Sequence, residues 1–260
     1  MTTRQRTWQR FGALFGMGAL GVLSLLPITI SQLQKLTTLN GAPLPPLPVL
    51  VAASLIQPLL LLALAVATGV RLAPRLNLRS HVAAWAGGEP PSEPRFRAQV
   101  RIAVGLGILT ALVILALDHF MLPTLGEAGQ NLRILQKRTA WEAIMSVLYG
   151  GITEELLMRW GLATFFAWAI AKIGKTTGSP TAGTMWAAVV LAALLFGAGH
   201  LPAVMGMGLP LTAPVIARTV VLNAIAGIVF GWLYFRRSLE AGMLAHATVH
   251  LTWTGLSLLV

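Results

Sequence analysis

The sequence predicts an all-α protein, a polytopic bundle of about seven transmembrane helices. Hydrophobic residues make up 56% of the 260 residues and charged residues only 10%, whereas about a quarter of a soluble domain is charged. The apolar residues fall in runs of about 20, the length that an α-helix needs to cross a bilayer. Lys and Arg gather between alternate runs, as in loops on the cytoplasmic side of a membrane.

The first half of the chain contains three of these runs. The first is long enough to span and lacks a clear small-x-small cleavage site, so we expect a retained helix and not a signal peptide. A Pro-rich connection over 40–48 and an Arg-rich loop over 71–97 separate the runs, and the turn sequence 87–91 lies inside that loop. The three expected spans cover residues 11–30, 49–70 and 100–117.

The second half begins after a polar connection over 118–138 with the longest apolar segment, 141–171. It is too long for one perpendicular helix, so we expect it to be tilted, bent at Gly150-Gly151, or divided near Gly161. A division would raise the number of spans to eight. A turn-rich loop over 176–184 and a link over 205–211 separate the remaining spans, which are expected at 185–201, 213–235 and 239–259.

The basic residues predict the orientation. The N-terminus, the 71–97 loop and two pairs of basic residues fall on one side of the predicted membrane, which makes this side cytoplasmic. We therefore expect an integral protein of the cell membrane, a single membrane domain over 1–260 that contacts anionic lipid headgroups and not nucleic acid. Its first three spans, within 1–138, carry no recognised motif, and 139–260 carry the motifs. The basic pairs are Lys172/Lys175 and Arg236/Arg237, and the opposite loops are poor in Lys and Arg except for Arg133, Lys137 and Arg138.

A cluster of three charged residues stands in the middle of the apolar segment that runs from about 141 to 171, namely Glu154, Glu155 and Arg159. A charge at membrane depth costs about 2.5 to 3.5 kcal/mol, so such a cluster indicates a functional site. Glu155 and Arg159 are four positions apart and can form an ion pair on one helical face. Glu154 points about 100° away and has no local partner. A structural lock between helices would explain the same three charges equally well. Gly150, Gly151 and Gly161 lie on the same helical face as Glu154. We expect these glycines to leave room beside Glu154 for the backbone of another helix.

Histidine is the other candidate for chemistry, because the chain has no cysteine and only five histidines. His81 and His119 lie in or beside predicted loops, where we expect them to be solvated and without a role. His200 ends a span, with the ring of Phe196 one turn earlier on the same face. His246 and His250 are one turn apart on a single face. A lone buried histidine is usually a core residue, but three of them beside a Glu-Glu-x-x-x-Arg cluster favour a site.

Four motifs follow one another across the last four predicted spans. In this order they resemble the motif series of the CPBP family, which comprises CAAX-prenyl endopeptidases and bacteriocin-processing or Abi-type membrane proteins. The resemblance covers about 141–253, and each motif alone is weak while the ordered set is specific. The motifs are Glu154-Glu155-x-x-x-Arg159, Phe196-x-x-x-His200, Asn223-x-x-x-Gly227-x-x-x-Gly231-Trp232-Leu233-Tyr234 and His246-x-x-x-His250.

The resemblance implies an intramembrane glutamic endopeptidase that acts on a protein or peptide within or beside the membrane and uses no metal cofactor. On this mapping Glu154 and His200 activate water. Glu155 and Arg159 support them.

The resemblance also implies that His246 and His250 stabilise the oxyanion. The best-studied branch of the family carries asparagine where this chain has His250. An imidazole can donate one hydrogen bond as an asparagine does, but it adds pH dependence. Asn223 recurs with Gly227 and Gly231 as a small-residue stripe, which indicates close helix packing, although the amide could also reach into a cavity.

Two rival interpretations remain. In a zinc-dependent intramembrane protease, His246 and His250 with Glu154 or His200 would bind the metal. Against it, no glutamate follows His246 directly as in the His-Glu-x-x-His arrangement, and the nearby Arg159 disfavours a dication. In a proton-coupled transporter or a catalytically silent scaffold, the same charges would relay protons or only hold helices together. The first three spans lack matching intramembrane charges, which disfavours transport.

Overall fold

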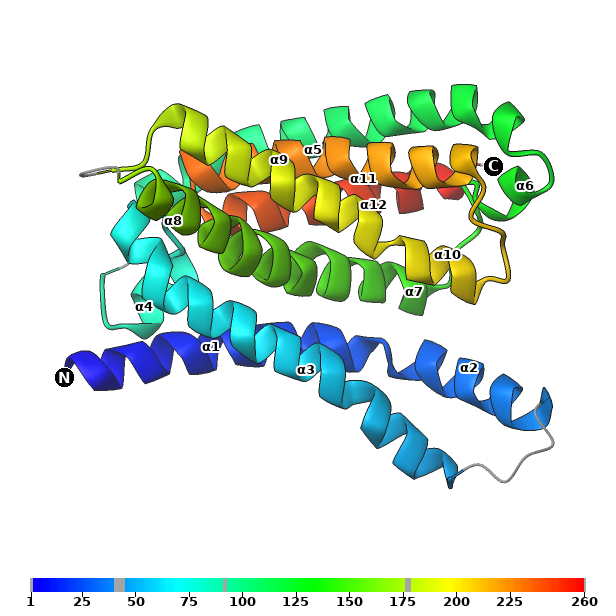
Figure 1. Cartoon of the computed structure of the whole chain (residues 1–260), viewed down its shortest axis with the longest axis horizontal. Helices are drawn as coiled ribbons and strands as arrows, with labels where there is room; N and C mark the ends of the chain where they lie inside the picture. The colour runs from blue at the N-terminus through cyan, green and yellow to red at the C-terminus, as the bar shows by residue number, and fades with distance from the viewer. Residues whose placement is uncertain (1, 40–44, 91–92, 176–178, 260) are drawn as a thin grey trace.

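The computed structural model describes residues 2–39, 45–90, 93–175 and 179–259, and these residues form helices and no strand. The helices run along the long axis of the molecule, with the N-terminus at one end and the C-terminus at the other (Figure 1). The predicted all-α membrane bundle is confirmed. The predicted connections 40–48 and 176–184 and the last residue of the turn 87–91 lie partly outside the described residues.

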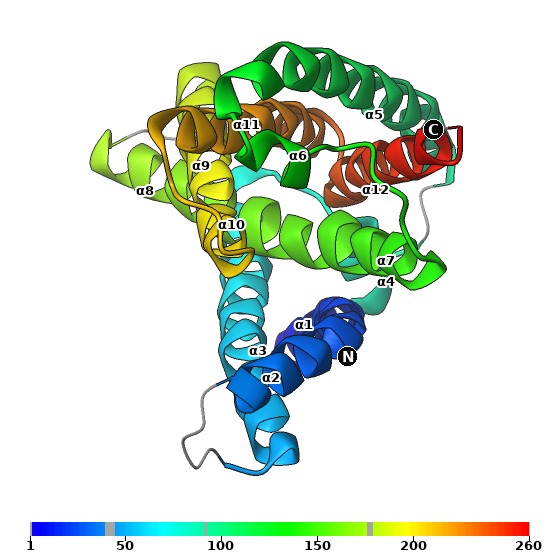
Figure 2. The ribbon, with the colours of Figure 1, turned by 90° about the vertical axis from the view of Figure 1, so that its right-hand side faces the viewer.

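Six helices in the described part of the chain are long and apolar enough to cross a membrane. The expected seventh crossing is helix α12, Leu239–Ser257, whose 19 residues include a glutamate and two histidines and are therefore less apolar. It lies beside α5 and α11 in the same group of helices as the candidate spans (Figure 2). The six candidate spans are Thr3–Lys35, Leu47–Leu76, Phe96–Leu125, Ala140–Ile173, Ala182–Gly206 and Ala213–Arg236.

The first crossing starts earlier than predicted. Helix α1, Thr3–Ser24, begins after Thr2, whose hydroxyl accepts a hydrogen bond from Gln5 N while Thr2 N donates to the Gln5 side chain. This capping box satisfies backbone groups at the helix start, so the basic residues before position 11 are helical. Helix α2, Leu26–Leu39, continues after a break at Leu25.

The Arg-rich loop 71–97 contains more structure than predicted. Helix α3, Leu47–Leu72, leads into the short 3-10 helix η1, Ala73–Leu76, and helix α4, His81–Ala86, follows. The third crossing, α5, already begins inside this loop at Glu93 and extends to Met121 (Glu93–Met121). The predicted span 100–117 is therefore correct in position but too short.

A carboxylate from the other end of the sequence holds α4 in place. Glu240 of α12 accepts hydrogen bonds from Ser80 Oγ at 2.6 Å, His81 N at 2.9 Å and Val82 N at 3.0 Å. The His81 ring also lies 2.7 Å from Gln99 Nε2. His81 is thus partly buried in a polar network, and the prediction that it is solvated was wrong. His119 is exposed, as predicted.

The fourth crossing is one continuous helical segment of 34 residues, so it does not supply an eighth span. Its centre winds as π-helix, and glycines let it approach its neighbours. A Cβ at Gly151 would lie 3.0 Å from Ala247 of α12 and one at Gly161 would lie 2.5 Å from Ala65 of α3. Its parts are α7 Ala140–Met145, η3 Ser146–Glu154, η4 Leu156–Ala163 and α8 Thr164–Ile173.

Helices α9, Ala182–Gly199, and α11, Ala213–Arg236, pack closely together. A Cβ at Gly227 would lie 2.8 Å from Ala193 and one at Gly231 would lie 2.9 Å from Val189. The predicted small-residue stripe is confirmed as a packing surface. Between these helices, α10 occupies Leu201–Gly206, so the link predicted at 205–211 starts later than expected.

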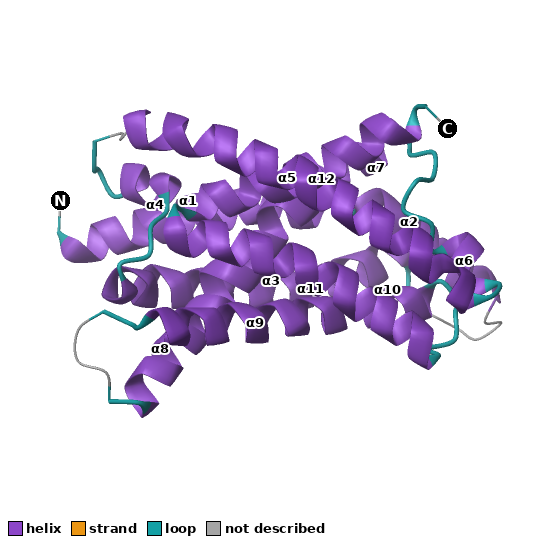
Figure 3. Cartoon of the chain, turned by 90° about the horizontal axis from the view of Figure 1, so that it is seen from above, coloured by secondary structure: helices purple, strands orange, loops and turns teal. Residues whose placement is uncertain are grey.

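The helices form a main group and a side layer. Viewed along the long axis, α5, α7, α9, α11 and α12 lie together, while α1, α2 and α3 lie to one side of them (Figure 2). Figure 3 shows α4 at the end that carries the N-terminus and α6, Ala128–Asn131, at the opposite end. The short 3-10 helix η2, Leu122–Leu125, joins α5 to α6.

We predict that Glu240→Ala lowers the free energy of unfolding by about 2 to 4 kcal/mol, because it leaves buried donors of α4 without an acceptor. Thermal unfolding of the protein in detergent measures this loss. Glu89→Ala is the matched control, since Glu89 is a half-exposed glutamate whose ion-pair partner is Arg10 and exposed pairs contribute about 0 to 1 kcal/mol. Equal unfolding temperatures of the two variants would contradict the role given to Glu240.

Candidate active site

The two glutamates lie where the fourth crossing is π-helical. Ser146–Glu154 and Leu156–Ala163 form consecutive π-helical segments, a geometry that is rare and frequent at functional sites. The hydroxyl of Thr153 donates to Gly18 O of α1 at 2.8 Å and so ties this segment to the first crossing. The local helix is therefore held from one side while Glu154 and Glu155 face other helices.

Glu155 is fully buried and joins two basic groups from two crossings. Its Oε1 lies 2.9 Å from Arg159 Nη1, as the spacing predicted, and 2.8 Å from Nδ1 of His246 on α12. Arg159 Nη2 also donates to Gly227 O of α11 at 3.2 Å. The Glu155–Arg159 pair thus links the fourth crossing to both α11 and α12.

Aromatic rings enclose this ion pair. The guanidinium carbon of Arg159 lies 4.9 Å from the ring centre of Phe196 and 5.3 Å from that of Phe230. Phe230 also stacks on His246, with ring centres 4.6 Å apart. Cation–π contacts of this kind stabilise a desolvated cation. The two rings therefore stabilise the buried charge of Arg159 in addition to its ion pair with Glu155.

His246 connects the buried pair to the second histidine of its helix. Since the carboxylate of Glu155 accepts a hydrogen bond, Nδ1 of His246 is the donor and a neutral ring presents the lone pair of Nε2. That Nε2 lies 3.2 Å from His250 Nε2 and 3.8 Å from Glu154 Oε2. His250 therefore donates its proton to His246, and its Nδ1 has no hydrogen-bond partner among the described residues.

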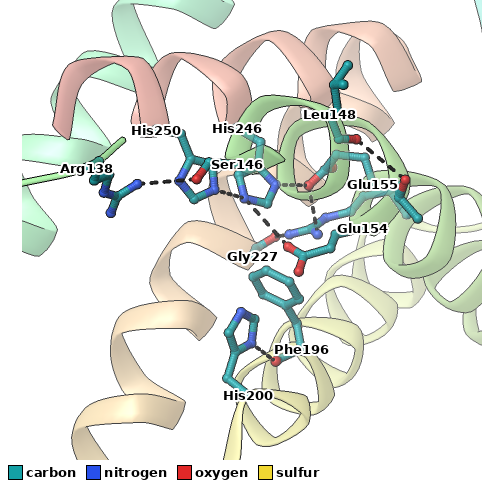
Figure 4. Close-up of polar contacts among 12 residues, drawn as sticks. Arg138, Ser146, Leu148, Glu154, Glu155, Phe196, His200, Gly227, His246 and His250 are labelled. Carbon is teal, nitrogen blue, oxygen red and sulfur yellow. Dashed lines mark hydrogen bonds and ion pairs between the residues drawn. The ribbon is translucent and has the colours of Figure 1, made fainter. Parts of the chain in front are cut away.

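Glu154 differs from its neighbour in exposure and in partners. Its side chain is 18% exposed, and the 3.8 Å to His246 is too long for a hydrogen bond. The sequence prediction that Glu154 has no close partner on its own helix agrees with this arrangement. In Figure 4 the Glu154 carboxylate lies between the ring of His246 and the ring of Phe196.

His200 lies at the junction of α9 and α10. Its Nδ1 is 2.8 Å from Phe196 O, so Nδ1 carries the proton and Nε2 is left as an acceptor. Its ring meets that of Phe196 edge to face, with centres 4.7 Å apart, as the spacing predicted. In Figure 4 the Phe196 ring lies between the His200 ring and the Glu154 carboxylate.

One cavity of about 280 Å³ brings most of the predicted site residues together. Glu155 and Arg159 do not line it and lie behind its wall. Asn223 does line it, although its amide nitrogen donates to Thr219 O at 2.8 Å within its own helix. The predicted site residues that line the cavity are Glu154, His200, Asn223, His246 and His250.

Sequence reasoning missed part of the cavity wall. Tyr149 and Ser146 precede Glu154 on the π-helical segment and line the cavity. Arg218 of α11 also lines it and forms a buried ion pair with Asp118 of α5 at 2.5 Å. The signal for this pair was a charged residue in each of two apolar helices, Asp118 in α5 and Arg218 in α11. The prediction placed Asp118 in a polar connection and gave Arg218 no role.

In the described residues, no three or more His, Asp or Glu side chains are arranged to hold a metal ion. In His246, Nδ1 faces the Glu155 carboxylate and Nε2 faces the His250 ring.

The fold and the cavity define a polytopic membrane protein with a buried Glu–His–Arg site. A family model described as Rce1-like, type II CAAX prenyl endopeptidase, matches residues 136–252. The matched segment contains all four motifs, and the match supports the CAAX-protease family that the motif order indicated, and with it a peptidase of the membrane. Searches of the curated proteins and of the solved structures found no match.

Arg159→Lys tests the buried pair. A lysine is a point charge and cannot hold Glu155 and Gly227 O together as the planar guanidinium does. We predict a loss of about 2 to 4 kcal/mol in the free energy of unfolding, because breaking a buried pair leaves an uncompensated charge. Peptidase activity should fall as well. Chemical or thermal unfolding in detergent measures the first effect, and a variant that behaves like the wild type would contradict the pairing as a lock.

Proposed function

We propose that the chain cleaves a peptide bond with a water molecule that Glu154 and His200 activate. The observation that carries this proposal is the division between the glutamates. Glu155 already binds Arg159 and His246, whereas Glu154 faces the cavity and has no hydrogen-bond partner among the described residues. A base must be able to reach the proton that it removes, and of the two carboxylates only Glu154 lines the cavity.

The proposed reaction uses each residue once. Glu154 takes a proton from water, and the water oxygen bonds to the carbonyl carbon. For Nε2 of His200 to orient the same water, the Phe196 ring that lies between the two side chains in Figure 4 must first turn aside. The carbonyl oxygen becomes an oxyanion. It accepts a hydrogen bond from Nε2 of His250, whose N–H exchanges its contact with His246 for this one. The carbon–nitrogen bond then breaks, and the proton passes from Glu154 to the leaving amine. Water exclusion by Phe196 and Phe230 strengthens these interactions.

The rest of the chain fits an enzyme of the cell membrane with a cytoplasmic N-terminus. The N-terminus and α4 lie at one end of the bundle (Figure 3), and the Arg-rich residues that flank η1 and the end of α11 lie in the connections at this end. Basic residues at one face support cytoplasmic placement and contact with anionic headgroups.

Metal removal separates this proposal from a zinc enzyme. We predict that purified protein in detergent or liposomes hydrolyses a quenched-fluorescent peptide at the same rate before and after treatment with a strong chelator. Glu154→Gln should abolish hydrolysis, since an amide keeps the shape and loses the basicity.

A zinc enzyme would lose activity on chelation and regain it with added zinc, because the metal lowers the pKa of its bound water. Stoichiometric zinc in active protein, held by Glu154, His200, His246 or His250, would overturn the proposal. Hydrolysis that survives Glu154→Gln would do the same. A transporter or a silent scaffold would show no hydrolysis in either condition.

The histidine that replaces the family asparagine gives a further prediction. His250→Asn should keep activity within about tenfold of the wild type, because asparagine also donates a hydrogen bond. His250→Leu should reduce kcat by about 10²- to 10³-fold, the effect of removing one oxyanion donor. Steady-state kinetics of both variants check this. Similar kcat values for the two would contradict an oxyanion role for His250.

A further inference from the structure

Tyr149 is a tyrosine in the wall of the catalytic cavity whose hydroxyl the proposed chemistry does not use. It lines the cavity with Glu154, His246 and His250, and the residue is half-buried. Its hydroxyl has no hydrogen-bond partner in the part of the chain that the structure describes. Because a buried phenol usually finds a partner, this group is available to a molecule bound in the cavity.

The π-helical winding brings Tyr149 to the side of the fourth crossing that carries Glu154. The two residues are five positions apart within Ser146–Glu154. In an α-helix this spacing would separate two side chains by about 140° around the axis. A π-helix joins residues five apart by its backbone hydrogen bonds, so the two side chains lie on nearly the same face. The Glu154 carboxylate also interacts electrostatically with the Tyr149 hydroxyl.

The proposed oxyanion donor lies beside the residue that follows Tyr149. A Cβ at Gly150 would lie 2.7 Å from Nε2 of His250 and 3.5 Å from Nε2 of His246. In this structure Nε2 of His250 is engaged with His246 at 3.2 Å. The nitrogen proposed to stabilise the oxyanion therefore touches the same helical turn that carries Tyr149, but it must first release another contact.

Three other neutral polar side chains of the cavity wall already donate hydrogen bonds to backbone carbonyl groups. Ser146 Oγ donates to Glu142 O at 2.7 Å, Asn223 Nδ2 to Thr219 O at 2.8 Å, and Trp253 Nε1 to Ala111 O at 3.0 Å. Tyr149 differs from them, because its hydroxyl proton is free for a ligand.

We propose that the Tyr149 hydroxyl donates a hydrogen bond to the substrate carbonyl oxygen as this becomes an oxyanion, together with Nε2 of His250. The inference rests on the proposed function and deepens it, because it adds a second donor to the same oxyanion. The phenol keeps its proton throughout, and no covalent bond to Tyr149 forms or breaks. A donor aimed at the charge that develops in the transition state lowers the barrier and contributes less to binding of the uncharged amide.

Tyr149→Phe tests the proposal, because it removes the hydroxyl and keeps the ring. We expect kcat to fall by about 10²- to 10³-fold, the effect of removing one oxyanion donor, while KM changes little. A peptide aldehyde forms a tetrahedral hydrate that resembles the reacting carbon. Its inhibition constant should rise by the same factor by which kcat/KM falls. Steady-state kinetics and inhibition of the purified protein in detergent measure both effects.

Tyr234→Phe is the matched control, because Tyr234 is the other tyrosine of the chain. Its hydroxyl forms a buried hydrogen bond with Thr164 Oγ1 at 2.8 Å, and it does not line the cavity. We expect this variant to unfold at a lower temperature with a wild-type kcat, and Tyr149→Phe to show the opposite pattern. An equal loss of kcat in both variants would assign the effect to stability and overturn the inference.

The outcomes also separate this inference from the proposed function. A wild-type kcat in Tyr149→Phe, with hydrolysis abolished in Glu154→Gln, overturns the hydroxyl donor and leaves the glutamate mechanism. A reduced kcat in Tyr149→Phe, with hydrolysis that survives Glu154→Gln, supports the donor and overturns the glutamate base. A reduced kcat without weaker aldehyde binding overturns the inference, because the hydroxyl would then act in a step other than oxyanion formation.

Discussion

The buried carboxylate of Glu155 is the contact on which the site depends. It sits at membrane depth, fully removed from solvent, and a single oxygen meets Arg159 at 2.9 Å and His246 at 2.8 Å. Placing one ion of this kind in a low dielectric costs several kcal/mol, which only its partners offset. Arg159 also donates a hydrogen bond to Gly227 O and so connects this ion pair to α11. Three crossings therefore share one electrostatic arrangement, and none can shift without leaving a charge unpaired.

This arrangement gives two neighbouring glutamates different tasks. Glu155 orients His246 and fixes its tautomer, since its carboxylate must accept the Nδ1 proton. Glu154 stays at the cavity with 18% of its side chain exposed. The π-helical winding places both in a segment held by Thr153 and by close glycine contacts. Arg218, paired with Asp118, is a buried cation in the cavity wall itself, whereas Arg159 lies behind that wall.

The sequence predicted the features that periodicity and spacing determine. The crossings follow from apolar runs, the Glu155–Arg159 pair follows from a spacing of four, and the family follows from the order of the motifs. Contacts between distant segments could not be predicted this way. Glu240 caps α4 from 160 positions away and Asp118 meets Arg218 across 100 positions, and no local pattern marks such partners. The π-helix was also missed, because its hydrogen bonding depends on the packing of neighbouring helices.

A side-by-side comparison of Glu154→Gln and Glu155→Gln tests the account most directly. Hydrolysis and the thermal unfolding temperature are measured for each purified variant under identical conditions. The account predicts that Glu154→Gln is inactive and unfolds like the wild type, while Glu155→Gln unfolds at a clearly lower temperature because Arg159 loses its counter-charge. Full activity of Glu154→Gln, or unchanged stability of Glu155→Gln, would contradict the division of tasks between the two glutamates.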